Sequence, residues 1–292
     1  MRVGFVIVSF NGGEDLANCV ISLLKVSKKY NRKVIVVDND SKDRSVEKIK
    51  KSNKVILILN NKNLGYAGAI NKGIQKAVSL DCDYLVFLNQ DTFFKNDFLT
   101  EIILGMESDR RVGVGSGLIV FTKNGKRLYD GGGKFNHFLG RGNHFHLSNK
   151  PSWKKMEVDY MAGCLMVLKR EVVEKVGLFD EDYFLGYEDV DYCMKVKNKG
   201  YKRCVFSKSE IYHKGSTSLK LLSGDWIYYW TRNRLLFIKK NYCVTQLVVN
   251  MIGIISYSLY FSFMVFVKSP RRTRDLFGGY WDFLSLKAGE RC

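Results

Sequence analysis

An acidic cluster in a strongly basic chain is the first candidate for chemistry. Six carboxylates fall between Asp180 and Asp191, and Glu188, Asp189 and Asp191 stand where an amphipathic helix is expected to begin. Acids are common in a first helical turn because the helix dipole favours them, so a structural role is one interpretation. Crowded carboxylates also raise one another's pKa, which suits a general base that works near neutral pH.

Asp91 is a second candidate, because it ends the apolar run Tyr84-Leu-Val-Phe-Leu-Asn-Gln-Asp91. A magnesium ion in phosphate chemistry is typically held by one or two carboxylates together with the phosphates themselves. The alternative is that Asp91 is a turn residue or caps a helix starting near Asn96.

Four histidines complete the set of chemistry-bearing residues. His213 follows an expected strand, Arg203–Ser207, although a lone histidine is more often structural. His137, His144 and His146 share one glycine-rich segment, and their spacing is not that of a strong metal site. For these three we expect substrate contacts or a surface position.

The elements that must position these side chains follow an α/β alternation. Apolar runs of strand length lie at Val3–Ser9, Lys33–Val37, Val55–Leu59 and Tyr84–Leu88. Stretches with helical spacing separate them, at Leu16–Val26, Ser45–Lys51 and Gly68–Val78. This rhythm predicts a mostly parallel central sheet flanked by helices, in which ligands bind beyond the carboxyl ends of the strands. All four strand ends carry Asn, Asp or Gly, which also favour turns.

The rhythm loosens after about residue 110. Glycine-rich and aromatic stretches follow, including Asp130-Gly-Gly-Gly133 and residues 136–146, and they predict a long functional or mobile loop. A second ordered block is expected from Tyr160 to about Ser218.

Composition limits the partners and the compartment. The 292 residues fit one large α/β domain with an appendage, and the net charge of +18 requires an acidic partner such as a nucleic acid, an anionic membrane or a phosphorylated substrate. Seven scattered cysteines without a C-x-x-C pair predict neither a disulfide framework nor a zinc site. The N-terminal apolar run is too short for a signal peptide, so we expect a cytosolic protein.

Seven motifs follow one another over about residues 1–240; they are Val36-Val-Asp-Asn-Asp-Ser-Lys-Asp43, Asn63-Leu-Gly-Tyr-Ala-Gly-Ala-Ile-Asn71-Lys-Gly, Phe87-Leu-Asn-Gln-Asp91-Thr, Gly163-Cys-Leu-Met-Val-Leu-Lys-Arg170, Gly177-Leu-Phe-Asp180-Glu, Tyr187-Glu-Asp-Val-Asp191-Tyr-Cys and His213-Lys-Gly-Ser. In order and spacing they resemble the family 2 glycosyltransferases with the GT-A fold, and within them the rhamnosyltransferase-like branch that builds bacterial cell-surface polysaccharides. The resemblance implies an inverting transferase that takes a sugar from a nucleotide-sugar donor. The leading expectation for this sugar is L-rhamnose, taken from dTDP-rhamnose.

The resemblance also implies roles for single residues. Asp189 matches the catalytic base, which Glu188 and Asp191 would hold or orient. Asp91 would be the remaining acid of the family's Asp-x-Asp metal element, whose first position is Asn89 here, and His213 would be a further metal or diphosphate contact for Mg²⁺ or Mn²⁺. Donor binding is implied for Ser9, Asn11, Asp38, Asn39, Gly65, Tyr66, Asn71, Asn89, Arg232 and Arg234, with Asp38 reading the base.

Arg232 and Arg234 belong to an Arg-Asn element, Tyr228-Tyr-Trp-Thr-Arg-Asn-Arg234. Arginine forks suit phosphate oxygens, so these side chains are expected to grip the diphosphate of the donor or of a lipid-linked acceptor. A basic helix face packed by its aromatic residues is the equally weighted alternative.

The C-terminal segment has a different character. Residues 241–267 contain no charged side chain and are long enough to cross a bilayer, but lysines and arginines lie on both flanks. We therefore expect a re-entrant or interfacial helix, or a helix pair, on the anionic cytoplasmic face of a membrane, in preference to a spanning helix. A core or dimer helix is the remaining alternative.

These observations predict a GT-A domain at residues 1–224 and a membrane-associating helical segment at 225–292. The donor half is expected at about 1–110 and the acceptor half, for a lipid-linked or polysaccharide acceptor, at about 111–224. Two alternatives remain, a sugar-phosphate nucleotidyltransferase and a non-enzymatic basic membrane-binding module. A nucleotidyltransferase usually has a basic, glycine-rich loop after its first strand, and no such basic residue follows Val3–Ser9 here. The sequence also contains no nucleic-acid-binding signature.

Overall fold

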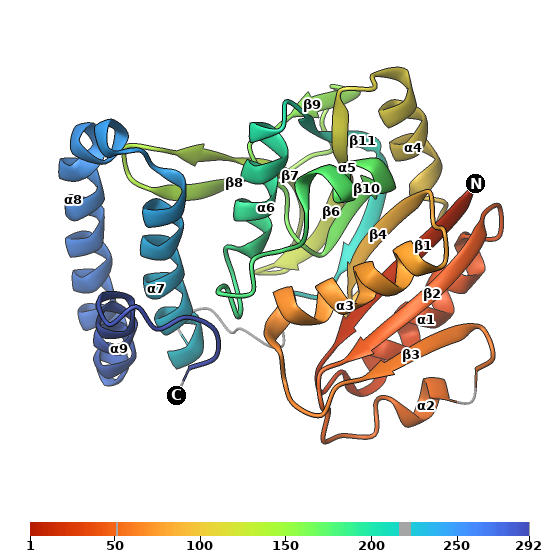
Figure 1. The fold of residues 1–292 in the computed structure, drawn as a ribbon, viewed down its shortest axis with the longest axis horizontal. Coiled ribbons are helices and arrows are strands. Elements are labelled where there is room, and N and C mark those ends of the chain that lie inside the picture. The colour runs from red at the N-terminus through yellow and green to blue at the C-terminus, as the bar shows by residue number, and fades with distance from the viewer. Residues whose placement is uncertain (51, 216–222, 292) are drawn as a thin grey trace.

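The parallel β-α half predicted from residues 1–90 is present in the computed structural model, which describes residues 1–50, 52–215 and 223–291 (Figure 1). Strands β1 to β4 alternate with helices α1 to α3, and β1 pairs in parallel with both β2 and β4. The bounds are β1 (Arg2–Ser9), α1 (Gly13–Val26), β2 (Asn31–Asp38), α2 (Glu47–Lys50), β3 (Val55–Leu59), α3 (Gly65–Ser79) and β4 (Tyr84–Asn89).

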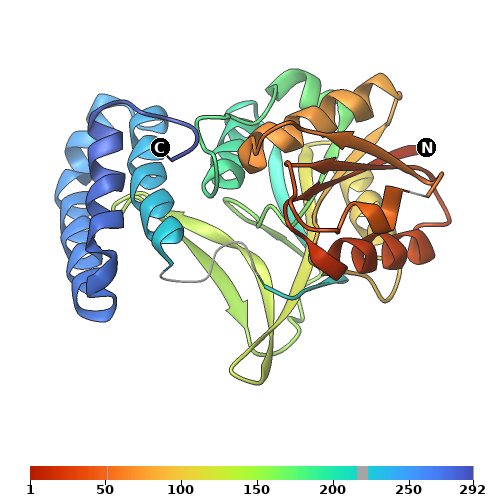
Figure 2. The ribbon, with the colours of Figure 1, turned by 90° about the horizontal axis from the view of Figure 1, so that it is seen from below.

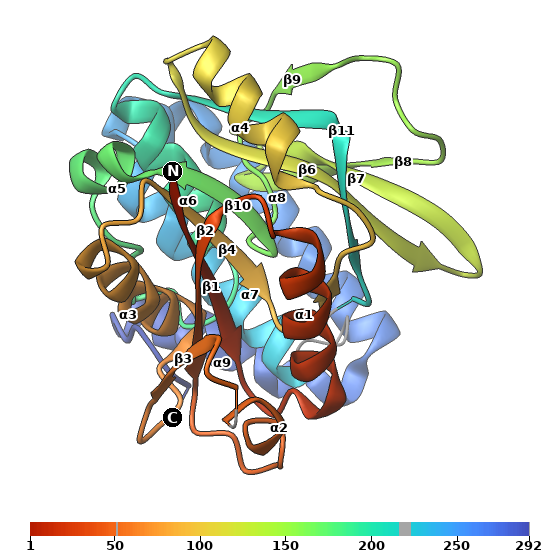
Figure 3. The same ribbon diagram turned by 90° about the vertical axis from the view of Figure 1, so that its right-hand side faces the viewer.

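Helices cover both faces of this half of the sheet, as the view in Figure 3 shows. Alternate residues of β1 point to opposite sides, so Phe5 and Ile7 pack toward α1 while Val6 and Val8 pack toward α3. Both sets are buried. A strand buried on both faces is uniformly apolar, which explains the continuous run in the sequence.

The expected α/β fold with a central sheet flanked by helices is confirmed, and the second half of this sheet is mixed in direction. The strand order is β3-β2-β1-β4-β10-β6-β11-β5, and β10 runs antiparallel to both of its neighbours. The remaining elements of this half are β5 (Thr92–Phe93), α4 (Leu99–Ser108), β6 (Val112–Lys123), β9 (Lys155–Glu157), β10 (Leu165–Lys169), α5 (Arg170–Val176), α6 (Glu188–Asn198) and β11 (Lys202–His213). The predicted block up to Ser218 ends outside the described residues, since nothing is described for 216–222.

The prediction of a long loop after residue 110 is wrong. This stretch continues as β6 into a hairpin of β7 (Lys126–Asn136) and β8 (Arg141–Leu147). Its glycines serve packing, because a Cβ at Gly133 or Gly142 would lie 2.5 or 2.6 Å from the ring or hydroxyl of Tyr160. Glycine here marks a close approach within strands, which composition alone presents as a loop.

Three helices at the C-terminal end form a separate layer beside the sheet domain (Figures 1 and 2). They are α7 (Gly224–Asn241), α8 (Val244–Lys268) and α9 (Thr273–Leu284), with the 3₁₀ turn Pro270–Arg272 before α9. Ile227 of α7, Tyr257, Phe261 and Val265 of α8, and Leu276 of α9 form their common core.

Arg234 of α7 joins this layer to the tip of the β7–β8 hairpin. Its guanidinium donates to the carbonyls of Leu139 and Gly140 at the tip, and to Ser258 and the Ile254 carbonyl of α8. The side chain is buried, with its guanidinium 4.8 Å from the centre of the Tyr257 ring. Arg234 is therefore a structural link between two segments about 100 residues apart in the chain.

Replacing Arg234 should weaken the attachment of the C-terminal helices to the β7–β8 hairpin. Arg234→Ala leaves two buried carbonyls without donors, and because each such group costs roughly 1–3 kcal/mol, we expect the free energy of unfolding to fall by about 3 kcal/mol. Chemical denaturation followed by circular dichroism measures this. The control Arg271→Ala, at an exposed position, should leave stability within about 0.5 kcal/mol of the parent. Equal stability of the two variants would contradict the assignment.

Candidate active site

A pocket opens at the carboxyl ends of β1, β2 and β4, where the alternation predicted it. We call it the strand-end pocket; it is lined by Val8, Phe10, Asn39, Asn63, Gly65, Tyr66, Asn89, Gln90, Asp91, Phe184 and Leu185. Asn39, Gly65, Tyr66, Asn89 and Asp91 were predicted from the sequence. Phe184 and Leu185 were not, because they come from a loop more than 90 residues away from Asp91 in the chain.

The loops that follow β1 and β2 are joined to each other by hydrogen bonds beside this pocket. Asp38 is buried and accepts from the backbone N–H and the hydroxyl of Ser41, and the backbone N–H of Asn11 donates to the same hydroxyl. The Asn11 side chain in turn accepts from the backbone of Lys42. Ser9 is buried with a hydroxyl that has no hydrogen-bond partner. Neither Ser9, Asn11 nor Asp38 lines the pocket directly.

Two amides fix the pocket wall. Asn39 is buried, donates to the Gly65 carbonyl and accepts from Asn60, which ties the end of β2 to the start of α3. Gln90 makes a paired contact with the backbone N–H and carbonyl of Phe10 at 3.0 Å each, which fixes the loop after β1. Sequence reasoning missed Gln90, although an amide between Asn89 and Asp91 at a strand end was a usable signal.

Gly65 and Tyr66 begin α3 against the loop that carries Phe184. Gly65 has φ +72°, and a Cβ there would overlap the Phe184 carbonyl, which accepts from the Tyr66 N–H at 2.9 Å. The Tyr66 hydroxyl donates to the Gly163 carbonyl, just before β10, at 2.8 Å. Glycine at position 65 is thus required by both the conformation and the close approach.

Asp91, which lines the strand-end pocket, and His213, which does not, approach each other from the end of β4 and the end of β11. His213 Nε2 lies 3.0 Å from Asp91 Oδ1, but the two atoms lack the alignment of a hydrogen bond. Asp91 is buried and does not cap α4, which begins at Leu99 and is capped by Asp97. An imidazole nitrogen and a carboxylate that face each other without pairing fit a shared divalent cation.

A second cluster of possible metal ligands lies on the β7–β8 hairpin. One ligand atom each from Asp130, His144 and His146 lies within 4.8 Å of the others. The closest pair, His144 Nδ1 and Asp130 Oδ2, is 2.8 Å apart, and Asp130 also accepts from the Gly132 N–H. We expected substrate contacts or a surface position for these histidines, but the fold brings two of them close to the buried carboxylate of Asp130.

Asp189 occupies the first turn of α6 in an environment built by backbone donors. Its two carboxylate oxygens accept from the N–H groups of Gly163, at 3.0 Å, and Val190, at 2.8 Å. The side chain is half-buried, and desolvation raises its pKa above the ordinary value, while the charge of His144 acts in the opposite direction. Gly163 therefore connects Asp189 to Tyr66 in the strand-end pocket.

Glu188 differs from its neighbour because it is buried and one of its carboxylate oxygens has no hydrogen-bond partner. Burial raises the pKa of Glu188, and the charge of Asp189 raises it further. The folded state therefore holds a proton on Glu188 at pH values where the unfolded chain would have lost it. Of the two neighbouring acids, Asp189 is consequently the one that ionises first.

The turn before these acids is strained and is held from α7. Gly186 and Tyr187 both have positive φ, at +82° and +75°. Asn233, fully buried, donates to the carbonyls of Leu185 and Gly186 at 3.0 and 2.7 Å. Arg232, also buried, donates to the Asp182 carbonyl at 3.0 Å.

The Arg-Asn element therefore holds the loop 182–187. Arg232 and Arg234 do not line the strand-end pocket, and both donate to backbone carbonyls, as expected of the packed helix face; the contact with a donor or acceptor diphosphate stays a prediction. The physical reason is burial, since a guanidinium fork fits backbone carbonyls as readily as phosphate oxygens.

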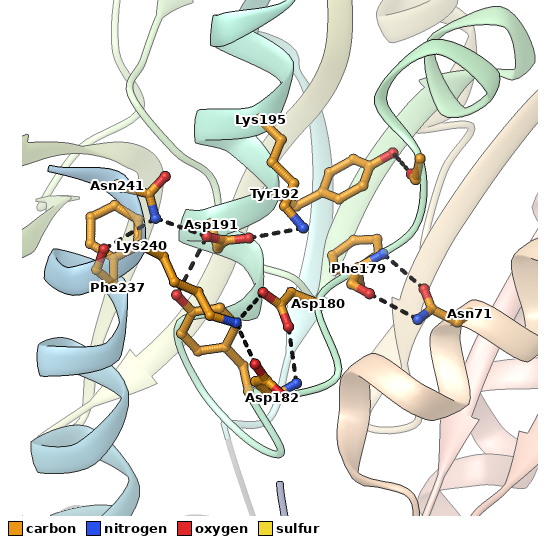
Figure 4. A network of polar contacts seen from close by, with 12 residues as sticks. Asn71, Phe179, Asp180, Asp182, Asp191, Tyr192, Lys195, Phe237, Lys240 and Asn241 are labelled. Atoms are coloured by element: carbon orange, nitrogen blue, oxygen red, sulfur yellow. Dashed lines mark hydrogen bonds and ion pairs between the residues drawn. The ribbon is translucent and has the colours of Figure 1, made fainter. Parts of the chain in front are cut away.

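Two further predicted residues also have structural partners (Figure 4). Asn71 is buried and exchanges hydrogen bonds with the backbone of Phe179 while donating to Glu181, so it lies behind the pocket and does not line it. Asp191 accepts from Asn241 of α7 at 2.9 Å and pairs with Lys195 at 3.2 Å. Asp191 thus orients α6 against α7, and no contact joins it to Asp189 in the described residues.

A second pocket adjoins the first across Leu185, and we call it the aromatic pocket. It is lined by Gly142, His144, Tyr160, Leu185, Gly186, Tyr187, Asp189, Val190, Trp226, Tyr229 and Trp230. Asp189 opens into it, so the loop 182–189 separates a cavity containing Asp91 from a cavity containing aromatic rings. Sequence reasoning missed this pocket, although Trp226 and Trp230, four residues apart on α7, were a usable signal.

Comparison with known proteins places the chain in a group of enzymes. The sequence profile described as Glycosyl transferase family 2 matches residues 5–177. The chain is similar to a dTDP-rhamnosyl transferase RfbF of Shigella flexneri, with 27% identity over 81% of this chain and 80% of the relative. It is also similar to an O-antigen chain rhamnosyltransferase RfbN of Salmonella typhimurium, with 24% identity over 73% of this chain and 66% of the relative.

Solved structures share the fold. The mannosyltransferase PcManGT of Pyrobaculum calidifontis, in complex with GDP-Man and Mn²⁺, matches 98% of this chain and 88% of its own with a TM-score of 0.61 and 14% identity. Staphylococcus aureus TarS 1–349, in complex with UDP-GlcNAc, matches 98% of this chain and 82% of its own, with a TM-score of 0.63 and 15% identity. GalNAc-T7 with UDP, GalNAc and Mn²⁺ reaches a TM-score of 0.65 at 20% identity, and this chain spans about half of it.

The profile covers more than half of the chain, and the resemblance seen in its motifs is confirmed. This decides against the nucleotidyltransferase and the non-enzymatic module. The chain belongs to glycosyl transferase family 2 and is a rhamnosyltransferase-like glycosyltransferase.

Proposed function

We propose that this enzyme transfers a sugar with inversion, from a nucleotide-sugar donor in the strand-end pocket to a hydroxyl in the aromatic pocket. The position of Asp189 carries the proposal, because its carboxylate is held by two backbone N–H groups and it lines the aromatic pocket, which adjoins the strand-end pocket at Leu185. L-rhamnose from dTDP-rhamnose is the proposed sugar, by similarity to the Shigella flexneri dTDP-rhamnosyl transferase. A lipid-linked or polysaccharide acceptor is proposed by similarity to the O-antigen enzyme.

Donor recognition is assigned to the parallel half, about residues 1–110. Asn39, Gly65, Tyr66 and Asn89 line the pocket. Asp38, together with the Ser9–Asn11 loop behind it, is proposed to read the base. Residues 111–224 form the proposed acceptor half.

The chemistry requires one ionised carboxylate and no covalent intermediate. Asp189 takes the proton from the acceptor hydroxyl as its oxygen bonds to the anomeric carbon, and the bond from that carbon to the nucleoside diphosphate breaks with its electrons. Glu188 keeps its proton because burial raises its pKa, so it is a poor nucleophile. A single displacement inverts the anomeric centre.

Asp91 and His213 are the residues that would hold a divalent metal, Mg²⁺ or Mn²⁺. Their facing but unpaired atoms fit such an ion, and two similar folds were solved with Mn²⁺. When bound, the ion supplies positive charge to the leaving diphosphate. Asn89 lies beside Asp91 and offers an amide oxygen in place of a second carboxylate.

The base assignment is tested by Asp189→Asn. We expect turnover to fall by about 10³-fold, because a general base contributes 10²–10⁴-fold, while affinity for the nucleoside diphosphate is retained. A donor panel led by dTDP-rhamnose measures turnover, and calorimetry measures nucleotide binding. Asp225→Asn is the matched control at an exposed position and should keep full activity. Full activity of Asp189→Asn would refute the assignment.

The metal assignment is tested by chelation and by Asp91→Asn. Turnover should fall at least about tenfold in EDTA and recover with Mn²⁺ or Mg²⁺, since the ion neutralises leaving-group charge. Asp91→Asn should raise the metal concentration needed for half-maximal activity at least about tenfold, since the carboxylate supplies the charged ligand. A metal titration of the parent enzyme, of Asp91→Asn and of Asp225→Asn measures this. EDTA-resistant turnover would contradict the metal requirement.

The helical layer is proposed to lie on an anionic membrane. Among the described residues, α8 is the single helix long and apolar enough to span a bilayer, with a mean hydropathy of 1.7. Its outer face is apolar and exposed, and α9 continues it; these residues are Val244, Leu247, Val248, Val249, Met251, Ile252, Ile255, Leu259, Tyr260, Phe263, Phe266, Val267, Phe277, Trp281 and Leu284. Basic side chains flank the helix at both ends.

The hairpin contact favours a helix lying in the interface over a spanning one. A Cβ at Gly253, near the middle of α8, would overlap the carbonyl of Phe138 at the hairpin tip. If α8 crossed the membrane, this tip and the guanidinium of Arg234 would have to enter the hydrocarbon core with it. Polar backbone and charge at that depth are strongly unfavourable.

Membrane binding is tested with vesicles. The triple variant Ile252→Asn, Leu259→Asn and Phe263→Asn should bind phosphatidylglycerol-containing vesicles at least about tenfold more weakly, because each exposed apolar side chain contributes roughly 1–3 kcal/mol on burial. Co-sedimentation measures binding. The double variant Leu59→Asn and Leu104→Asn, on exposed positions of the sheet domain, is the control and should bind normally. Equal binding by all three proteins would contradict the proposed orientation.

A further inference from the structure

The β7–β8 hairpin brings two imidazoles and one carboxylate together. His144 and His146 are two residues apart on β8, and alternate residues of a strand point to the same side. Asp130 of β7 is the register partner of His146 in the antiparallel pair. One ligand atom of each residue lies within 4.8 Å of the others. The His-x-His spacing, which suits neither a helix nor a turn, is the spacing that gathers two side chains on one face of a strand.

The backbone orients the carboxylate of Asp130 within this cluster. Its Oδ1 accepts from the N–H of Gly132 at 2.8 Å, inside the β-bulge between Asp130 and Gly133. Its Oδ2 lies 2.8 Å from His144 Nδ1 and 3.9 Å from His146 Nε2. Carboxylates that bind metals are usually held in this way, by a further hydrogen bond that fixes their direction.

A simple pair of Asp130 and His144 does not account for His146. The 3.9 Å distance from its Nε2 to the same oxygen is too long for a hydrogen bond. Two ligand atoms on one tetrahedral zinc ion lie about 3.3 Å apart, so shifts of roughly 0.5 Å bring both nitrogens to that separation from Oδ2. Asp130 is only 10% exposed, and buried charges are paired or bind metals.

The cluster is open to an ion from solvent. The imidazoles of His144 and His146 are 32% and 45% exposed, although Asp130 is buried. Three protein ligands leave the fourth position of a tetrahedral ion to water.

The donor set selects a different ion from the one proposed at Asp91 and His213. Imidazole nitrogens suit Zn²⁺, whereas Mg²⁺ prefers oxygen ligands in near-octahedral geometry. The hairpin cluster offers two nitrogens and one carboxylate, so Zn²⁺ is expected to bind there in the presence of Mg²⁺.

We propose that Asp130, His144 and His146 form a zinc site that joins β7 to β8 at their bulge. The bulge interrupts the ladder between the two strands, and the ion links them at this point. The hairpin reaches from the sheet domain to the C-terminal helices, which its tip contacts, so the ion stiffens the connection between them (Figure 1). The site does not rest on the proposed reaction, which is assigned to other residues.

Zinc binding is tested on the untagged, full-length, metal-free protein in excess Mg²⁺. Zn²⁺ is titrated in competition with a chromophoric chelator, and we expect the parent to bind one equivalent at the hairpin. The dissociation constant should rise at least about tenfold in His146→Gln and in Asp130→Asn, because each variant loses one of three ligands. The half-exposed His146 does not support the core, so His146→Gln keeps the fold even if Asp130→Asn disturbs the bulge.

Three variants control for other zinc ligands. His137→Gln makes the same change at an exposed position in the turn of the same hairpin, and Cys243→Ser removes an exposed thiol. Asp91→Asn removes the carboxylate of the proposed Mg²⁺ or Mn²⁺ site. All three should keep the parent's affinity for Zn²⁺.

Hydrogen exchange measures whether the ion joins the strands. Zn²⁺ should slow amide exchange across residues 126–147 of the parent and leave exchange in His146→Gln unchanged, because the ion holds the hairpin closed. Equal exchange with and without Zn²⁺ in the parent would contradict this link.

Three binding results would overturn the site itself. The parent could bind no Zn²⁺ in excess Mg²⁺, or His146→Gln and Asp130→Asn could bind it like the parent. The third result is loss of zinc binding in Asp91→Asn, which would assign the ion to the strand-end pocket. None of these results decides the transfer reaction, which Asp189→Asn tests separately.

Discussion

The geometry of the candidate active site depends on one buried amide, that of Asn233. Its two N–H groups hold the carbonyls of Leu185 and Gly186, at the point where the backbone enters two successive left-handed conformations. Without such a constraint this turn would relax, because left-handed tyrosine is disfavoured. Leu185 lines both pockets and Glu188 and Asp189 follow directly, so one side chain of α7 sets the wall between the cavities and the start of α6.

Hydrophobic periodicity was sufficient to predict the parallel half of the fold. Continuous apolar runs at β1 and β4 reflect strands buried on both faces, and this signal is local. The β7–β8 hairpin was not predictable by the same means, because its pairing depends on Tyr160, a residue distant in sequence that fills the space above Gly133 and Gly142. Glycine has the same appearance in a sequence whether it serves a loop or a close contact.

The candidate site was predicted where residue chemistry and strand ends coincide, as for Asp91, Tyr66 and Asn39. It was missed, or its contacts were not predicted, where burial decides which atoms a side chain meets. Arg232 and Arg234 have the charge and shape of phosphate ligands, but packing of α7 turns them onto backbone carbonyls. Phe184 and Leu185 have no chemical signal of their own, and they reach the pocket through the strained turn that Asn233 holds.

The anchoring role of α7 has a consequence for the order in which the protein matures. During synthesis the sheet domain emerges first, and its strands, loops and acidic cluster are complete before Asn233 leaves the ribosome. Until then the turn at Gly186 and Tyr187 has no donor for its carbonyls, and the wall formed by Trp226 and Trp230 does not exist. A nascent chain is therefore expected to be inactive until the C-terminal helices pack against the sheet domain. Activity is then expected to begin only after the exposed apolar surface of α8 has also been synthesised.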